Sequence, residues 1–200
     1  MNLRLRSREA QLSQLHAQAE FGEKENDDNL SWSSFCRGIT CNENFILVGT
    51  SFGHIIQFQC NSELSISTKK YFKEHSASIV DLATCCYDLI TCSGDSSGLI
   101  IIWNKNFKGV QVKIATEHPI TAMSILRKQI IVGTLRGRII LYSATGGELK
   151  AEVEYRHSDE LPNCLIMGAQ FTNGRGSDIA LACFDRNMLF RYRLCRKNVS

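Results

Sequence analysis

A short pattern that recurs four times along this chain constrains its fold more than any other feature. In each copy an apolar run leads into a turn, and an aliphatic and then an aromatic residue follow two and five positions after the turn anchor. The four copies are residues 49–58, 94–103, 133–142 and 183–192. Successive copies begin 45, 39 and 50 residues apart. Because self-similarity at this period is typical of stacked units, the pattern predicts a repeat protein.

The glycines of this pattern predict tight hairpin turns. The first three copies carry two glycines four positions apart, and Asn187 takes the place of the second glycine in the fourth copy. Glycine reaches a positive φ at little cost, and asparagine is the next best residue there. Two strand-like runs precede each turn, one follows it, and the segments between copies supply another. Four strands of about six residues and their turns need about this much chain, so each unit is expected to be a four-stranded sheet.

Histidines stand before the second, third and fourth units, at His75, His118 and His157. Four-stranded units of about 40–45 residues, introduced by a histidine and closed by an aromatic residue, resemble the blades of WD-repeat β-propellers. Residues 93–104 are the best single match, with Asn104 where the family usually has Asp. The resemblance implies that the following residues are structural anchors: Gly49, Gly53, Phe58, His75, Gly94, Gly98, Trp103, His118, Gly133, Gly137, Tyr142 and Tyr192.

The chain departs from the family pattern at one set of positions. The family has an Asp just before the turn glycine, where it bonds the histidine of the same blade. Those places here hold Phe52, Ser97, Arg136 and Arg186. We therefore expect this hydrogen-bonded network to be mostly absent, with the blades held together by apolar packing.

A closer resemblance concerns several shorter stretches, which are similar to the family of WD repeat-containing protein fifty-four. They are residues 35–39, 48–53, 95–99, 141–147 and 168–171. Members of that family are longer, with propeller sequence before the match and one more blade between the stretches that match Leu149 and Val153. The resemblance therefore implies a shortened form.

The predicted fold is all-β, a partial WD-repeat β-propeller that forms an open arc of about four blades over residues 31–200. The blade units are expected near residues 34–74, 75–117, 118–156 and 157–195. Residues 1–30 are polar and read as an extension that is either a short helix over residues 9–20 or disordered. An open arc leaves two uncovered blade faces, and exposed apolar faces favour self-association.

The composition and motifs of this chain argue against a catalytic, metal-binding or cofactor-binding site. The formal net charge is +3, and no apolar run approaches the roughly 20 residues of a membrane-spanning helix. Nine cysteines show no C-x-x-C spacing, and no metalloprotease, nucleophile-elbow or phosphate-loop motif occurs. We expect no catalytic residue, no metal and no cofactor, and free cysteines indicate a reducing, cytoplasmic setting. Peripheral association with vesicles or membranes stays compatible with that setting.

The carboxyl-terminal end is the most basic part of the chain. Arg191, Arg193, Arg196 and Lys197 follow Asp185 without another acid. Arg191 and Arg193 alternate on an expected strand and so share a face. This face is either a contact surface for RNA or an acidic partner, or an edge strand that charge protects from pairing.

The function that these features favour is a non-catalytic scaffold for protein–protein interaction, with loops and rims presented by a rigid stack of sheets. Its expected partners are other proteins, including copies of itself, and nucleic acid is the less favoured partner. A subunit of an RNA-associated assembly that uses the basic end is the alternative, and an enzyme with a site built from loops is a third and weaker one.

Overall fold

The computed structural model describes residues 36–42, 44–60, 66–145, 152–184 and 186–194. Over these residues the chain forms fifteen β-strands and one short 3-10 turn, η1 (Lys105–Phe107). The predicted extension over residues 1–30 lies outside the described residues, as do Arg196 and Lys197.

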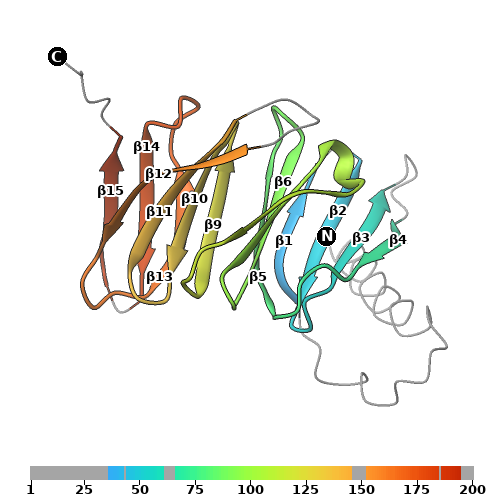
Figure 1. Ribbon diagram of the computed structural model, residues 1–200, viewed down its shortest axis with the longest axis horizontal. Coiled ribbons are helices and arrows are strands. Elements are labelled where there is room, and N and C mark those ends of the chain that lie inside the picture. Colours follow the sequence, from blue (N-terminus) through green and yellow to red (C-terminus); the bar gives the residue numbers. More distant parts are fainter. Residues whose placement is uncertain (1–35, 43, 61–65, 146–151, 185, 195–200) are drawn as a thin grey trace, which may run out of the picture.

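The strands form four antiparallel sheets that follow one another along the chain (Figure 1). Sheet 1 contains β1 (Cys36–Cys41), β2 (Phe45–Thr50), β3 (Ile55–Cys60) and β4 (Ile66–Phe72). Sheet 2 contains β5 (Ile79–Cys85), β6 (Ile90–Asp95), β7 (Leu99–Trp103) and β8 (Val110–Ala115). Sheet 3 contains β9 (Ile120–Leu126), β10 (Gln129–Thr134), β11 (Arg138–Thr145) and β12 (Glu152–Glu160). Sheet 4 contains β13 (Ile166–Phe171), β14 (Asp178–Cys183) and β15 (Leu189–Arg193).

The sheets stand side by side in chain order, with sheet 1 and sheet 4 at opposite ends (Figure 1). The first strands of successive sheets, β1, β5, β9 and β13, contact one another and form the inner side of the arc. Since each sheet meets only its sequence neighbours, the arrangement confirms the prediction of an all-β, open propeller arc.

Sheet 4 differs from the predicted four-stranded unit. In the described part of the chain β15 has no strand on its outer side, whereas β3, β7 and β11 each pair with a fourth strand. The prediction that His157 lies in the turn before the fourth unit is wrong, because β12 extends to Glu160 and pairs His157 with Leu141. The strand reaches that far because its partner β11 has eight residues, against five in β7.

The fourth hairpin turn also differs from the other three. Ala182 pairs with Leu189, so this turn covers residues 183–188, one more than the turn over residues 50–54 between Gly49 and Ile55. Asn187 has no positive φ, contrary to its predicted role.

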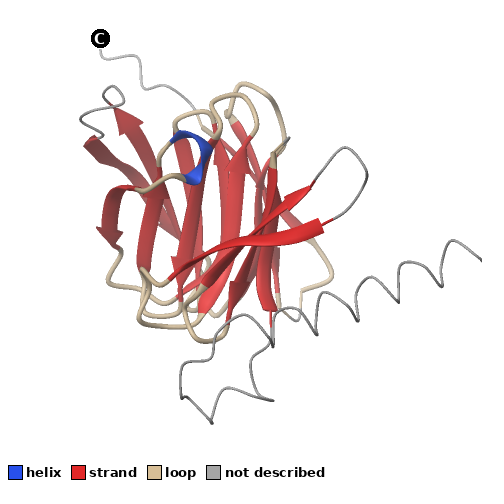
Figure 2. Cartoon of the chain, turned by 90° about the vertical axis from the view of Figure 1, so that its right-hand side faces the viewer, coloured by secondary structure: helices blue, strands red, loops and turns tan. Residues whose placement is uncertain are grey.

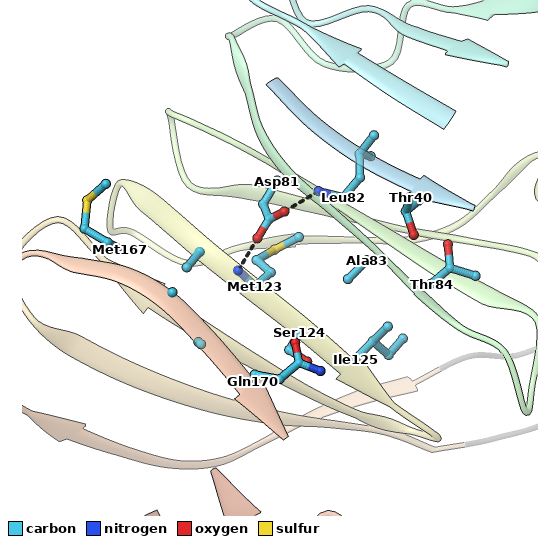
Figure 3. Close-up of a pocket in the computed structure, with 13 residues that line it drawn as sticks. Thr40, Asp81, Leu82, Ala83, Thr84, Met123, Ser124, Ile125, Met167 and Gln170 are labelled. Atoms are coloured by element: carbon cyan, nitrogen blue, oxygen red, sulfur yellow. Dashed lines mark hydrogen bonds between the residues drawn. The ribbon is translucent and has the colours of Figure 1, made fainter. Parts of the chain in front are cut away.

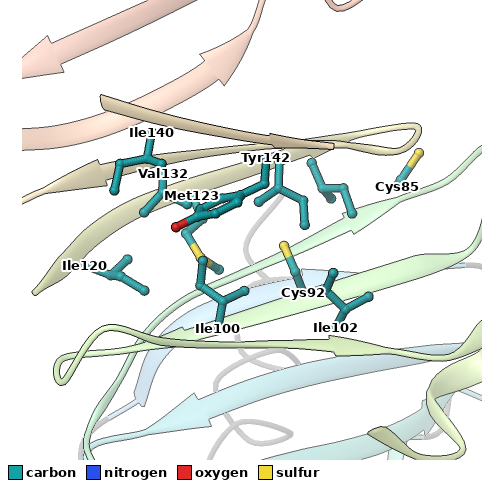
Figure 4. Close-up of a cluster of buried hydrophobic side chains, with 11 residues drawn as sticks. Cys85, Cys92, Ile100, Ile102, Ile120, Met123, Val132, Ile140 and Tyr142 are labelled. Carbon is teal, nitrogen blue, oxygen red and sulfur yellow. The ribbon is translucent and has the colours of Figure 1, made fainter. Parts of the chain in front are cut away.

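Apolar clusters fill the three spaces between neighbouring sheets. Between sheets 2 and 3, for example, Cys92, Ile100 and Ile102 face Val132 and Tyr142 (Figure 4). Full burial of one such side chain is worth about 1.5–3 kcal/mol, so each space contributes strongly to stability. The stack is therefore held together mainly by side chains that alternate from face to face along the strands.

The first glycine of the repeated pattern is required by close approach of the next sheet. A Cβ at Gly94 would lie 2.6 Å from Met123 Sδ, and Cβ atoms at Gly49 and Gly133 would overlap Ile79 and Ile166. Each of these contacts comes from the inner strand of the following sheet, so glycine here allows two sheets to meet. The paired position in sheet 4 holds Ala182.

Candidate interaction surface

The second glycine of the pattern lies in a hairpin turn that the next connection crosses. Gly53, Gly98 and Gly137 have φ values of +81°, +98° and +80°. A Cβ at Gly53 would lie 2.7 Å from the carbonyl oxygen of His75, and one at Gly98 would lie 2.6 Å from that of His118. Both carbonyls belong to the connection that leads into the next sheet. Glycine is therefore required at these positions for two reasons: its positive φ, and the lack of room for a Cβ beside the carbonyl oxygens.

The turns of sheets 2, 3 and 4 at this edge are tied to their own sheets by backbone hydrogen bonds. The amides of Ser96 and Leu135 donate to the carbonyls of Ser78 and Pro119, at 2.9 and 3.1 Å. The amide of Phe184 donates in the same way to Leu165, at 2.8 Å. Figure 2 shows the loops gathered along the two edges of the stacked sheets. These ties fix the turns of one edge to the rigid stack.

Exposed apolar side chains occupy this edge, and we call them the turn rim. The turn rim consists of Phe52, Leu135, Phe184 and Met188, which are 43% to 59% exposed. They come from the turns of sheets 1, 3 and 4, while sheet 2 has Ser96 and Ser97 in its turn. Single exposed apolar residues are ordinary, but a row of them at equivalent turns on a fixed frame is typical of a protein interface.

A buried network in sheet 2 is an exception to the expectation that such hydrogen bonds are mostly absent. His75 Nδ1 lies 2.8 Å from Asp95 Oδ2, and His75 Nε2 lies 2.7 Å from Ser93 Oγ. Trp103 Nε1 donates to the same Ser93 Oγ at 2.8 Å. Asp95, which bonds the histidine, is the last residue of β6 and lies three residues before Gly98. The prediction that the position of this Asp is directly before the glycine, at Ser97, is therefore wrong for sheet 2. This network ties the connection before sheet 2 to the centre of that sheet.

The network keeps His75 neutral and Asp95 ionised. Burial lowers the pKa of His75 below its ordinary 6.5, although Asp95 acts in the other direction. Burial works against the ionised form of Asp95, but hydrogen bonds from Ser97 and His75 outweigh it and lower the pKa of this carboxyl. The pair is therefore a neutral imidazole that donates to a carboxylate.

The equivalent positions of sheets 1 and 3 lack this network, as expected. Thr134 stands in the place of Asp95 in sheet 3, and His118 Nε2 lies 2.9 Å from the guanidinium of Arg138. In sheet 1, Thr50 Oγ1 accepts the amide of His54 inside the turn. Of the predicted aromatic anchors, Trp103 and Tyr142 are buried, while Phe58 and Tyr192 in the two end sheets are half-buried.

A cavity of about 350 Å³ lies on the inner side of the arc, among β1, β5, β9 and β13 (Figure 3). Asp81 lines it from β5 and bridges two sheets, because its carboxylate accepts the amides of Met123 at 2.7 Å and Leu82 at 2.9 Å. Burial raises the pKa of Asp81, and the two amides partly offset this. With its oxygens used by amides, this carboxylate joins sheet 2 to sheet 3.

The predicted basic face is present on β15, where Arg191 and Arg193 share one side of the strand. Both guanidinium groups bond Asp178 Oδ1, at 3.1 and 3.2 Å. The hydrogen bond from Arg193, with the charge of Arg191, lowers the pKa of Asp178. One carboxylate therefore neutralises part of the basic face.

The described residues hold no group of three or more His, Cys, Asp or Glu side chains arranged to bind a metal ion. None of the helices in the described ranges is long and apolar enough to cross a membrane.

Comparison with solved structures places the fold among β-propellers. The designed protein Ika4 superimposes with a TM-score of 0.65 at 16% identity, over 87% of this chain and 100% of that one. The β-propeller domain of Cps50 (Swd1) from Myceliophteria thermophila superimposes with a TM-score of 0.59 at 12% identity, over 76% of this chain and 50% of that one. At these identities the likeness concerns the fold alone.

Comparison with protein families and curated sequences is more specific. The family model named WDR54 matches residues 22–158. Human WD repeat-containing protein 54 is 28% identical over 132 residues, which cover 60% of this chain and 38% of the human protein. The chain thus spans well under half the length of this relative. The family model covers more than half of the chain and includes sheets 1 and 2 and nearly all of sheet 3, so the chain belongs to the WDR54 family of WD-repeat proteins.

Proposed function

We propose that this chain is a non-catalytic scaffold that binds partner proteins through the turn rim. The observation that carries the proposal is the row of exposed apolar side chains, Phe52, Leu135, Phe184 and Met188, on equivalent hairpin turns, of which those of sheets 3 and 4 are tied to the stack by backbone hydrogen bonds. Apolar and aromatic anchors on a rigid support lose little conformational entropy on binding. Membership of a WD-repeat family supports a scaffold of this kind.

The test is affinity purification of the chain with quantitative mass spectrometry of the retained proteins. The rim variant Phe52→Ser/Leu135→Asp is compared with the wild type and with Tyr87→Ser. Tyr87 is 74% exposed, but it lies in the β5–β6 turn at the other end of the strands. We expect proteins that the wild type and Tyr87→Ser retain and the rim variant loses. Equal retention by all three chains would refute the rim as the binding surface.

The alternative function, a subunit of an RNA-associated assembly, depends on Arg191 and Arg193. Their shared bond to Asp178 makes them a weaker RNA surface than four free basic residues would be. Salt-dependent binding of single-stranded RNA that Arg191→Ala/Arg193→Ala abolishes would favour this alternative. We further propose the cytoplasm as the place of action, because buried Cys85 and Cys92 pack as small apolar residues with free thiols.

A further inference from the structure

The edge of the stack opposite the turn rim carries a group of exposed positive charges, which we call the basic edge. This edge holds the β5–β6, β9–β10 and β13–β14 turns and the connection through η1, and it lies uppermost in Figure 1. The cations of the basic edge come from the turns of sheets 2, 3 and 4, and all of them are exposed. They are Lys105, Lys108, Arg127, Lys128 and Arg175.

Contact between two neighbouring turns brings the cations of sheets 3 and 4 together. Arg127 and Lys128 form the whole β9–β10 turn, and Arg175 lies in the β13–β14 turn. These two turns lie against each other, because a Cβ at Gly176 would overlap the side chain of Gln129. The three cations therefore sit on touching turns at the same edge.

The turn that carries Arg127 is fixed to sheet 2. The amide of Arg127 donates to Cys85 Sγ at 3.0 Å, which ties the β9–β10 turn to the end of β5. The guanidinium of Arg127 lies over the ring of Tyr87 in the β5–β6 turn, 6.0 Å from the ring centre. A cation held over an aromatic ring is attracted by the electrons of that ring. Both the backbone and the charge of Arg127 are thus held in place before any partner binds.

The backbone of the β9–β10 turn does not explain why an arginine stands at its first position. Arg127 has a φ of +54°, in the left-handed region that favours glycine or asparagine. An arginine at this position costs conformational energy that a glycine would not. Unfavourable backbone of this kind points to a use for the side chain, which here is the guanidinium.

The described part of the chain pairs none of these cations with an acid. The ion pairs among the described residues lie elsewhere, on His75, Lys113, Arg138, Arg191 and Arg193. Asp88, the acid of the β5–β6 turn, lies 3.8 Å from Cys85 Sγ, which donates to it. A group of cations on fixed turns attracts a partner of opposite charge and sets its orientation.

Carboxylates match these cations better than a nucleic acid does. Arginine pairs with carboxylates through two parallel hydrogen bonds, and it is enriched among the residues that dominate protein interfaces. Proteins that bind single-stranded nucleic acid also present a series of exposed rings on which bases stack. Tyr87 is the one exposed ring that the described residues place at this edge, and Arg127 lies over it. The edge therefore favours a protein segment rich in Asp and Glu.

We propose that the basic edge binds an acidic segment of a partner protein. Carboxylates of that segment pair with Arg127, Lys128 and Arg175, while Lys105 and Lys108 extend the positive field toward sheet 2. The basic edge and the turn rim lie at opposite ends of the strands, so the stack can hold two partners at once. The two surfaces share no residue.

The first experiment selects the segment from a random-peptide phage library on the whole chain. Peptides that also bind the triple variant Arg127→Gly/Lys128→Ser/Arg175→Ser are removed. Glycine suits the left-handed backbone at position 127, and all three positions are exposed, so this variant should fold like the wild type. We expect the remaining peptides to be enriched in Asp and Glu. Remaining peptides without an excess of acid would overturn the proposal.

Fluorescence anisotropy with one selected peptide then measures what the edge contributes. We expect the triple variant to bind this peptide about tenfold more weakly than the wild type does, and the same peptide with Asn and Gln in place of Asp and Glu to lose its affinity for the wild type. The matched control Lys73→Ser/Arg136→Ser/Arg186→Ser removes as much charge from exposed residues at the opposite edge, and it should bind like the wild type. Equal weakening by both triple variants would show that net charge alone acts, and would overturn the proposal.

Single-stranded RNA and the turn-rim variant complete the test. Poly-uridine RNA that binds more tightly than the peptide, and less tightly to the triple variant of the basic edge, would assign this edge to nucleic acid and overturn the proposal. Phe52→Ser/Leu135→Asp should bind the peptide like the wild type, and loss of the peptide in this variant would contradict two separate surfaces. The triple variant of the basic edge should still retain the proteins that the turn rim binds, so each proposal can fail while the other stands.

Discussion

Removal of the Ser93 hydroxyl tests how much the buried network of sheet 2 stabilises the chain. Trp103 Nε1 can only donate, so Ser93 Oγ accepts that bond, and its own proton is available to His75 Nε2. Ser93→Ala therefore leaves one buried donor and one buried acceptor without a partner. An unpaired buried polar group costs about 1–3 kcal/mol, so we expect the free energy of unfolding to fall by about 2–4 kcal/mol.

The assay is urea denaturation followed by circular dichroism, with every variant measured at one protein concentration. Ser96→Ala in the neighbouring turn is the control, because Ser96 is exposed and surface changes usually stay within about 0.5 kcal/mol. A double-mutant cycle with Trp103→Phe adds a second check, since Ser93→Ala should cost less once the indole donor is gone. A loss below about 1 kcal/mol for Ser93→Ala would show that water or repacking replaces these bonds, and it would refute the reasoning.

Three further predictions concern packing, pH and thiol exposure. Gly133→Ala should destabilise the chain by about 1–3 kcal/mol because a Cβ overlaps Ile166, while Gly174→Ala, with open space around it, should stay within about 0.5 kcal/mol in the same denaturation assay. Burial lowers the pKa of His75 in the folded chain, so its neutral form stabilises the fold fully above the ordinary pKa of 6.5, and this stabilisation is lost as the pH falls below 6.5. The free energy of unfolding should therefore decrease on acidification below pH 6.5, and it should decrease less steeply in His75→Gln. An equal slope in that variant would contradict the assignment of His75. Native alkylation followed by peptide mass spectrometry should modify Cys41 and Cys86 and spare Cys85, Cys92, Cys164 and Cys183, and rapid labelling of Cys92 would argue against its burial.

The repeated unit could be predicted from sequence because its signals are local. Two glycines four residues apart, with an aliphatic and an aromatic residue after them, set the turns of sheets 1 to 3. The network around His75 could not be predicted from the family pattern, because Asp95 lies three residues before Gly98 instead of directly before it. What places Asp95 is the pairing of Ile79 with Asp95, which brings the end of β6 next to the connection that carries His75.

The candidate surface was less predictable because it depends on neighbours in space. In the sequence Phe52 and Leu135 look like ordinary turn residues, and only the stacking of the sheets places their turns along one edge. Likewise, Leu189 follows the aliphatic pattern of Ile100 and Ile139, and it is exposed because none of the described sheets packs on its side of sheet 4. The role of Asp81 depends on an amide 42 positions away in the sequence.

The connections that cross the hairpin turns give the stack a direction. Gly53, Gly98 and Gly137 each lie under the chain segment that enters the following sheet, whereas the described residues place no such segment over residues 183–188. Protection against local opening should therefore be graded along the chain. Amide exchange and protease cleavage would begin at the carboxyl-terminal hairpin, and each earlier turn would be released only after the segment above it had come away.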